Sequence, residues 1–361
     1  MTAKGFIQTS SQIIWQTARN SGDNTMNTSI FKKALLAGFA SLLLSGTALA
    51  ENWKFAIEEI PGSIMDSYAQ AFKKHVESKT NGEVTVSVYP LGALGTPTEV
   101  AEQTADGVIQ FSNLSVGNLG TLVPESQILL LPYVMPSDSQ QADRILADSP
   151  TLNQGLAKFF AAKGLKLGAL YSEGPMYWTT RKIVRTPADL SNLKVRVMVS
   201  PLLLKAYEDL GASPTPISFG EVYGALQLGQ IDAQVNPIPA IEEMKFYEVT
   251  DYLINFGELN LVTAVMASED WYQALPANRK QLVDETLAEV KAEMPAIVKR
   301  FNEERWAAIQ KAKPQVKMIE LTADERAVFR QRSAKTQAAV SGLVGKQGSE
   351  LLQSLVAEIG N

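Results

Sequence analysis

The segment KVRVMVSPLLLKAYEDLGASPTPISFGEVYGALQLGQIDAQVNP (Lys194–Pro237) contains a strand, a helix and a second strand in succession. The apolar residues of Val195–Val199 predict a buried strand. Ser200-Pro201 predicts the start of a helix that Gly211 ends, because serine caps helix N-termini and proline suits the first turn. Ile231–Val235 predicts the next strand. This alternation of strands and helices indicates an α/β fold.

The same alternation extends over the rest of the chain. The predicted strands are 53–57, 84–89, 108–112 and 165–170, and the predicted helices are 64–80, 97–106, 222–228, 239–247 and most of 277–312. Two capping boxes, Ser218 with Glu221 and Thr322 with Glu325, mark further helix starts, and Pro295 predicts a kink or a break. We expect layers of helices on mostly parallel sheets. A chain of this length predicts two lobes with a ligand cleft between them.

The composition excludes several classes of protein. The 361 residues carry a formal net charge of -5, which argues against nucleic-acid binding through excess basic charge. The chain has no cysteine and a single histidine, His75, so disulfides, thiol catalysis and multi-histidine metal sites are excluded. The motifs of phosphate-binding loops, dinucleotide folds, serine hydrolases and zinc proteases are absent from the sequence. We therefore expect no enzyme, no cofactor and no metal.

The N-terminus has the pattern of a secretory signal peptide. Lys32 and Lys33 precede the apolar run Ala34–Leu44, and the motif Ala48-Leu49-Ala50 follows. The run is shorter than the roughly 20 apolar residues of a membrane span, although an uncleaved anchor is the alternative. We expect residues 1–50 to be removed in export to the periplasm, leaving Glu51 as the mature N-terminus. Residues 1–25 lack any such pattern, which is consistent with a mis-assigned start.

Three residues of the central segment admit both a structural and a functional interpretation. Arg196 lies between two valines of a strand, so it pairs either with an internal carboxylate (Asp189 or Glu221) or with a bound carboxylate. Asn236 precedes a proline at a strand end, where a turn and a ligand contact are both common. Phe219 fits either a core or a binding site.

Five ordered blocks resemble the solute receptors of tripartite ATP-independent periplasmic (TRAP) transporters, the DctP family. They are Asn81–Gly95, Leu129–Met135, Thr186–Pro201, Gly211–Pro237 and Lys245–Val249. The resemblance implies a two-lobed periplasmic binding protein with a long helix spanning both lobes. It assigns residues 51–173 and about 262–301 to lobe I, and residues 174–261 and about 302–361 to lobe II.

The resemblance also implies roles for the three central residues. In similar receptors the arginine at the place of Arg196 binds the substrate carboxylate, the asparagine at the place of Asn236 is a second donor, and the aromatic residue at the place of Phe219 packs over the solute. Some sialic-acid receptors of the family carry another arginine about twenty residues earlier, where this chain has Met176. Met176 and Trp178 offer an apolar lining instead, and Trp178 either stacks on a solute ring or lies in the core.

The other lobe supplies three further candidates. Glu58 follows the first strand at the place of a polar contact in similar receptors, where a carboxylate can pair with a hydroxyl or an amine of the solute. Asn113 and Ser115 fall at the end of another strand that faces the cleft. We expect all three residues to border the binding site.

The function that these observations predict is a monomeric periplasmic receptor. It would bind a small carboxylate-containing organic acid by lobe closure and deliver it to a TRAP permease in the membrane. One alternative is a receptor for a membrane sensor kinase, which would use the same closure. Another is a periplasmic hydrolase, which turnover of esters or glycosides by the pure protein would reveal.

Overall fold

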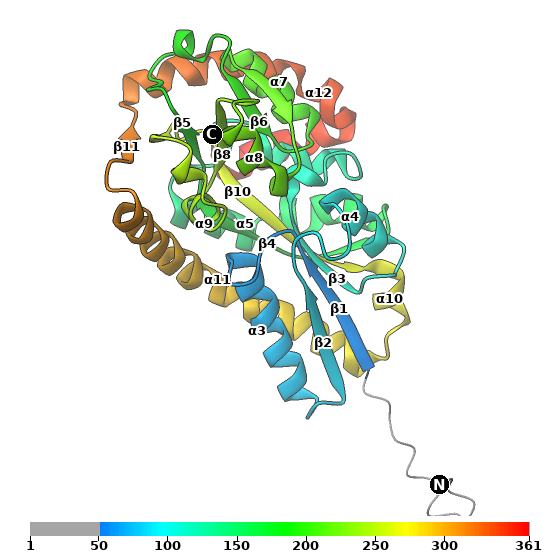
Figure 1. The fold of residues 1–361 in the computed structure, drawn as a ribbon. Coiled ribbons are helices and arrows are strands. Elements are labelled where there is room, and N and C mark those ends of the chain that lie inside the picture. Colours follow the sequence, from blue (N-terminus) through cyan, green and yellow to red (C-terminus); the bar gives the residue numbers. More distant parts are fainter. Residues whose placement is uncertain (1–50, 361) are drawn as a thin grey trace, which may run out of the picture. The chain divides into compact units, whose positions relative to one another are not determined.

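A computed structural model describes residues 51–360, which belong to one compact unit (Figure 1). The predicted signal peptide lies outside the described residues. Within residues 51–360, no helix is both long and apolar enough to cross a membrane.

The first lobe is built on a five-stranded sheet with the order β2-β1-β3-β10-β4. Its strands are β1 (Glu51–Ile57), β2 (Val84–Tyr89), β3 (Phe111–Ser115), β4 (Leu165–Pro175) and β10 (Asn260–Ser268). The helices of this part of the chain are α3 (Ile64–Lys79), α4 (Pro97–Ala105), α5 (Ser139–Asp148), α6 (Ala157–Ala161) and α10 (Glu269–Ala274). Alternating apolar residues in β2 bury one face of that strand, as the sequence predicts.

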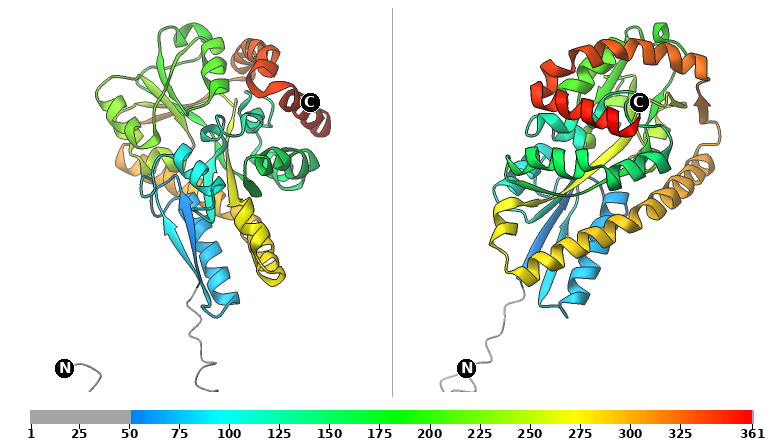
Figure 2. Two further views of the ribbon diagram at one scale, coloured as in Figure 1. Left: turned by 90° about the vertical axis from the view of Figure 1, so that its right-hand side faces the viewer. Right: turned by 180° about the vertical axis from the view of Figure 1, so that it is seen from behind.

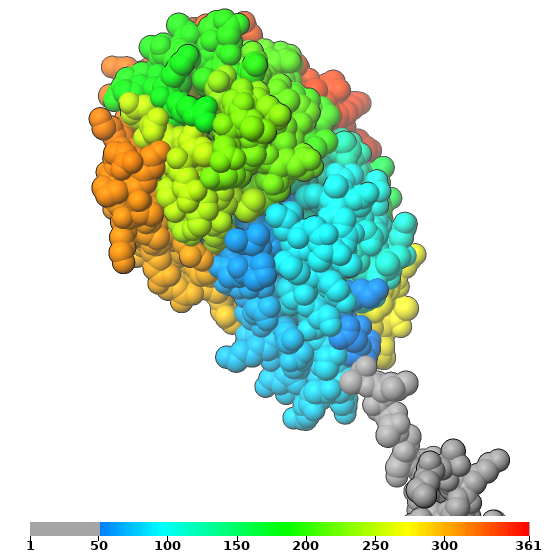
Figure 3. Space-filling model, in the orientation of Figure 1, coloured from blue at the N-terminus to red at the C-terminus, as the bar shows by residue number. Residues whose placement is uncertain are grey.

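The second lobe is built on a six-stranded sheet with the order β11-β9-β5-β8-β6-β7. Its strands are β5 (Tyr177–Thr180), β6 (Lys194–Val197), β7 (Ser213–Pro216), β8 (Ala233–Asn236), β9 (Tyr252–Asn255) and β11 (Lys317–Glu320). The helices between these strands are α7 (Pro201–Leu210), α8 (Val222–Gln227) and α9 (Ile238–Glu243). Figure 3 shows the second lobe, in green, in direct contact with the blue and cyan surface of the first.

Both sheets are mixed: five of the strand pairs in the described residues are parallel and four are antiparallel, so parallel pairing predominates only narrowly. β10 pairs antiparallel with β3 and β4, and β5 pairs antiparallel with β8 and β9. The reason is that the chain passes from one sheet to the other between β4 and β5 and returns between β9 and β10. A third passage leads from α10 (Glu269–Ala274) through the following long helix to β11. The residue boundaries expected for the lobes remain a prediction.

Two long helices complete the fold. α11 (Ala277–Ala312) packs against α3 and β4 of the first lobe and against α9 of the second, so it spans both (Figure 2). It continues through Pro295 without the break that the proline suggested. α12 (Ala323–Ile359) packs against α7 and changes direction at Gly345, whose φ of 73° is non-helical.

Local sequence signals account for most of the helix ends. The Ser200 hydroxyl accepts a hydrogen bond from the backbone of Leu203, and Gly211 ends α7 in the left-handed conformation. Thr322 and Glu325 form the predicted capping box of α12. The box predicted for Ser218 and Glu221 is wrong, because the Ser218 side chain makes no cap hydrogen bond there.

Two strands begin later than predicted, since the strand expected at 231–235 is β8, Ala233–Asn236, and a larger shift occurs in β3. The strand expected at 108–112 is β3, Phe111–Ser115, and Val108 is exposed. β3 is a central strand between β1 and β10, and all five of its residues are buried.

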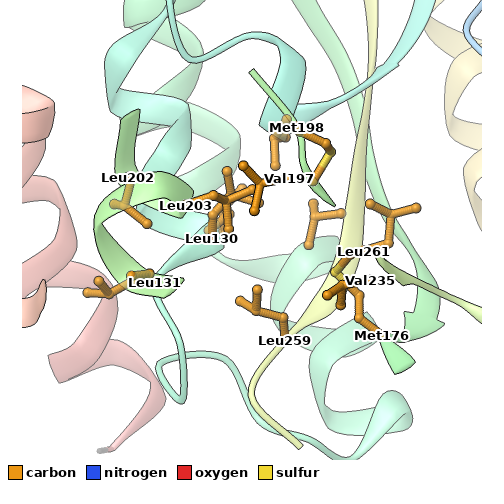
Figure 4. Packing of buried hydrophobic residues seen from close by; sticks show 14 of the residues in the cluster. Leu130, Leu131, Met176, Val197, Met198, Leu202, Leu203, Val235, Leu259 and Leu261 are labelled. Atoms are coloured by element: carbon orange, nitrogen blue, oxygen red, sulfur yellow. The ribbon is translucent and has the colours of Figure 1, made fainter. Parts of the chain in front are cut away.

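A continuous apolar cluster links the two sheets. Its members come from both lobes and from the segment before α5, and Figure 4 labels Leu130, Leu131, Met176, Val197, Met198, Leu202, Leu203, Val235, Leu259 and Leu261. Because these side chains are almost fully removed from water, their burial stabilises the region where the lobes meet.

Candidate functional site

A narrow cavity lies where strand ends of the two sheets converge. Its lining residues are Glu58, Glu59, Asn118, Arg196, Met198, Phe219, Asn236 and Leu261. Glu58 and Glu59 follow β1, and Leu261 belongs to β10 of the same sheet. Arg196 lies in β6 and Asn236 ends β8 of the other sheet. The cavity therefore has one wall from each lobe.

Arg196 is the basic residue of this cavity. Its side chain is 3% exposed, its Nε donates a hydrogen bond to the carbonyl oxygen of Ile217 at 2.8 Å, and its Cζ lies 5.9 Å from the centre of the Phe219 ring. Burial lowers the pKa of Arg196 to about 10, so the guanidinium stays charged at neutral pH.

The internal ion pairs considered for Arg196 are absent from the described part of the chain. Asp189 instead accepts hydrogen bonds from Arg185 and Thr186, and no ion pair joins Arg196 to Glu221 within residues 51–360. Arg196 uses one of its five N–H donors for the backbone, so the other N–H groups can donate to a bound solute.

Glu58 faces Arg196 from the other wall. Asn118 donates a hydrogen bond to Glu58 Oε2 at 3.0 Å, and the Ser115 backbone is a second donor. Burial raises the pKa of Glu58 to about 7, while Asn118 and the charge of Arg196 act in the opposite direction. The cavity thus presents a cation on one side and a titratable carboxyl on the other.

Asn236 and Phe219 complete the wall around Arg196. The Asn236 amide donates a hydrogen bond to Gln234 Oε1, and the Gln234 amide donates one to Thr179 Oγ1 at 3.0 Å. These two bonds fix the orientation of the Asn236 and Gln234 amides. The Phe219 ring is half-buried and meets Phe246 edge to face at 6.0 Å. Its other surface is available to the cavity that it lines.

The structure places the remaining four predicted residues outside the cavity lining. Trp178 is fully buried, stacks on Phe256 at 4.9 Å, and donates its indole N–H to Glu258 at 2.6 Å. Met176 packs in the apolar cluster near Leu259 and Leu261 (Figure 4). Both side chains are therefore part of the core in this conformation.

Asn113 and Ser115 lie behind the cavity wall. The Asn113 amide donates to the Tyr171 hydroxyl at 2.9 Å, and the residue is fully buried. Ser115 Oγ contacts Sδ of Met198 at 2.9 Å and accepts a hydrogen bond from the Gly117 backbone. Ser115 thus supports two lining groups, Met198 through its hydroxyl and Glu58 through its backbone.

Four of the residues that line the cavity are not among the candidates that the sequence predicts. Met198 could have been found, because residues two apart on a strand share a face and Arg196 lies two positions earlier. Glu59 adjoins Glu58 in sequence, whereas Asn118 and Leu261 come close to the site only through the fold. Among the described residues, no group of three or more His, Cys, Asp or Glu side chains is arranged to hold a metal ion.

Comparison with known proteins gives a consistent result. Residues 55–341 match the family described as bacterial extracellular solute-binding protein, family 7. The ectoine/5-hydroxyectoine-binding periplasmic protein of Ruegeria pomeroyi is 36% identical over 330 residues, which cover 91% of this chain and 96% of that protein.

Solved structures share the fold, among them the following two. The periplasmic ectoine-binding protein of the TeaABC TRAP transporter of Halomonas elongata superimposes with a TM-score of 0.83 at 37% identity, covering 86% of this chain and 99% of that one. A TRAP periplasmic solute-binding protein of Marinobacter aquaeolei VT8, solved as an apo open structure, gives a TM-score of 0.78 at 34% identity and covers 84% and 99% of the two chains.

Proposed function

The chain belongs to the bacterial extracellular solute-binding proteins of family 7, which serve TRAP transporters, and from this premise we propose that it binds a small organic acid through Arg196. Its relatives are binding proteins of transporters and not enzymes, and the same holds for this chain. The family is periplasmic.

The observation that carries the proposal is the buried, charged Arg196 in a cavity wall, which makes no ion pair within 4 Å to any carboxylate of the described residues, although Glu58 faces it across the cavity. A guanidinium holds a carboxylate through two parallel hydrogen bonds, which makes arginine the preferred residue for this task. Asn236 lies in the same wall and supplies an amide as the second donor. A solute carboxylate would therefore satisfy the donors that the protein leaves open.

Glu58 and Phe219 indicate which other groups the solute carries besides its carboxylate. Glu58 is an acceptor when ionised, so it pairs with a hydroxyl or an amine of the solute, and Phe219 packs against the apolar part. Ectoine carries a carboxylate and is named as the ligand of two relatives, at 36% identity each, so it is the first compound to test. The structural neighbours of this family include receptors with bound D-glucuronate and succinate, which are the next acids to test.

Delivery follows from the same proposal. The signal peptide directs the chain to the periplasm with Glu51 as its mature N-terminus, and the solute closes lobe I (51–173 and about 262–301) on lobe II (174–261 and about 302–361). The closed form then docks on the membrane subunits of a TRAP permease. If the chain instead serves a sensor kinase, the same closure would signal rather than deliver, and a copurified kinase in place of a permease would reveal it.

A thermal-shift screen of organic acids, headed by ectoine, tests the binding function. A true ligand at about 100 times its dissociation constant should add about 2.7 kcal/mol to the free energy of unfolding. Arg196→Lys is the matched control, since it retains the charge and loses the planar two-point contact. Equal stabilisation of both proteins, or no stabilisation by any carboxylic acid, would refute the assignment of Arg196.

A further inference from the structure

Two carboxyl groups of the first lobe, Glu59 and Glu173, are in contact beside the cavity, and a third carboxyl group, Glu243 of the second lobe, lies close enough for its charge to act on them. Glu59 follows β1 and Glu173 lies in β4, both in the first lobe, whereas Glu243 ends α9 of the second lobe. The residues Glu59 and Glu173 are 4% and 1% exposed, and the Glu243 side chain is 6% exposed. Glu59 also lines the solute cavity. The cluster therefore lies at the junction that must open for a solute to enter.

The contacts within this carboxyl cluster (Glu59, Glu173 and Glu243) require a proton. The side chains of Glu59 and Glu173 lie close enough to each other for a hydrogen bond between their carboxyl groups. Two carboxylates are both acceptors, so such a bond exists only when one of them is protonated. Glu173 Oε1 also accepts from the Thr263 hydroxyl at 3.0 Å, and Glu59 Oε2 accepts from the Met65 backbone at 3.3 Å. Glu243 Oε1 has no hydrogen-bond partner within the described residues.

Positive charge around the cluster is insufficient to balance it. Arg305 of α11 lies 3.3 Å from a Glu242 oxygen and 3.5 Å from Glu243 Oε1, and Lys245 pairs with Glu242. The other charged or titratable groups nearby are Glu58 and Arg196 in the cavity, Tyr171 in β4, and Asp66 and Tyr68 in α3. The four carboxyls at 59, 173, 242 and 243 thus face two cations, one of which is exposed.

Arg305 connects this cluster to the first lobe as well. Its Nη2 donates a hydrogen bond to the carbonyl oxygen of Gly62, in the loop between β1 and α3, at 3.0 Å. The same guanidinium therefore holds a backbone group of one lobe and two carboxyls of the other. Opening the lobes would break this bridge and separate Glu243 from Glu59.

We propose that closure of the two lobes takes up a proton at Glu59, Glu173 and Glu243, so that acid favours the closed form. The proposal needs lobe closure but no particular solute, and it is therefore independent of the ligand assignment above. A relative has been solved in an open apo form, which shows that this fold supports the opened state.

The direction of the effect follows from proton linkage. In the described conformation, where residues of both lobes line one cavity, burial raises the pKa of Glu243 to about 9, the charge of Glu59 adds to this increase, and Arg305 opposes it. Burial and the charge of Glu59 likewise hold the pKa of Glu173 well above its usual range. Opening hydrates Glu243 and returns its pKa towards the ordinary value. The closed form then binds more protons between about pH 4.5 and 9, and the closed-to-open ratio falls by up to about tenfold per pH unit as the pH rises in that window.

The absence of native cysteine allows a direct measurement of closure. Lys74→Cys on α3 and Leu228→Cys beside α8 place two spin labels on exposed positions of opposite lobes. Double electron–electron resonance on the unliganded protein then gives the populations of short and long distances between pH 6 and 9. We expect the short-distance population to decrease as the pH rises.

Substitution of the cluster decides the origin of the change. Glu243→Gln mimics the protonated carboxyl, so it should retain the short distance at pH 9 and flatten the pH dependence. Glu173→Gln should do the same in part, and it is the substitute if Glu243→Gln fails to fold. Glu208→Gln, on an exposed position of α7, is the matched control and should behave as the parent. A distance distribution that does not change with pH, or that changes equally in the parent and in Glu243→Gln, would overturn the proposal.

Discussion

Nε of Arg196 donates a hydrogen bond to the carbonyl oxygen of Ile217 at 2.8 Å. This bond joins β6 to the segment that carries Phe219, and it uses the donor at the side of the guanidinium rather than the two at its end. The terminal nitrogens therefore remain as a planar pair, which matches the two oxygens of a carboxylate. The same contact sets the guanidinium 5.9 Å from the centre of the Phe219 ring, so that the cation and the aromatic wall are positioned together.

Arg196→Ala should abolish binding of the acid that the screen identifies. The solute carboxylate would be buried without its partner, at a cost on the order of 3–5 kcal/mol, or a few hundred- to a few thousand-fold in affinity. Arg196→Lys should weaken binding less, because it retains the charge while losing the two-point geometry. Calorimetry on folded variants measures both effects. Wild-type affinity in Arg196→Ala would show that the arginine is structural.

Asn236→Ala provides the graded comparison. It removes one neutral donor and leaves the charge pair intact, so the expected loss is about 1–3 kcal/mol. The Asn236 amide already contacts Gln234 in the structure, and the variant should therefore also be checked for a change in thermal stability. A loss larger than that of Arg196→Ala would reverse the assigned order of importance.

The bend in α12 gives a prediction about stability alone. Gly345 has φ 73° and ψ 173°, a region that only glycine populates readily, so Gly345→Ala should cost about 1–3 kcal/mol. Gly342, three residues earlier, has ordinary helical geometry and open space around its Cα. Gly342→Ala should therefore stabilise the protein by about 0.5–1 kcal/mol. Denaturant unfolding compares the two, and destabilisation of equal size would contradict the role of the bend.

Local signals in the sequence predict much of this fold. Helix α3 begins and ends within one residue of its predicted bounds, because its apolar spacing and its caps act over a few residues. The start of α7 is correct for the same reason. The antiparallel placement of β5 and β10 could not be predicted, since it depends on where the chain passes between the sheets. The length of β4 and the position of β3 also depend on neighbouring strands rather than on local periodicity.

The candidate site likewise contains residues that the sequence predicts and residues that only the fold brings there. Glu58, Arg196, Phe219 and Asn236 fall at or near strand ends and line one cavity, which is where α/β folds usually place ligands. Asn118 and Leu261 lie in segments without any local signal of binding, and they join the cavity through the packing of the first lobe. An aromatic residue such as Trp178 fits a core and a binding site equally well in sequence, because both environments are apolar on one side and polar on the other.

Glu258 makes stability depend on pH. Burial raises the pKa of Glu258 to about 7. The contribution of the protonated Glu258 to the free energy of unfolding is therefore complete below about pH 4.5, and it is lost as the pH rises through 7. Glu258→Gln cannot ionise. The decrease in the free energy of unfolding between pH 4.5 and 8.5 should therefore be about 1–3 kcal/mol smaller in Glu258→Gln than in the parent. Denaturant titrations at both pH values test this, with Glu208→Gln as the exposed control. If Glu258→Gln has the same pH dependence as the parent, a group other than Glu258 causes the change in stability with pH.

Trp178 distinguishes a core role from a binding role. Its indole donates to the buried Glu258 at 2.6 Å and stacks on Phe256, and it does not line the cavity. Trp178→Phe should therefore lower the free energy of unfolding by about 2–4 kcal/mol, since it leaves a buried carboxyl oxygen without a donor and creates a void. Solute affinity should change by less than about threefold.

Phe219→Ala is the converse variant, because the half-buried ring lines the cavity, and it should weaken binding while costing less stability. Calorimetry and unfolding measurements on both variants separate the roles. A tenfold loss of affinity in Trp178→Phe at unchanged stability would place the indole against the solute, in a conformation different from the one described.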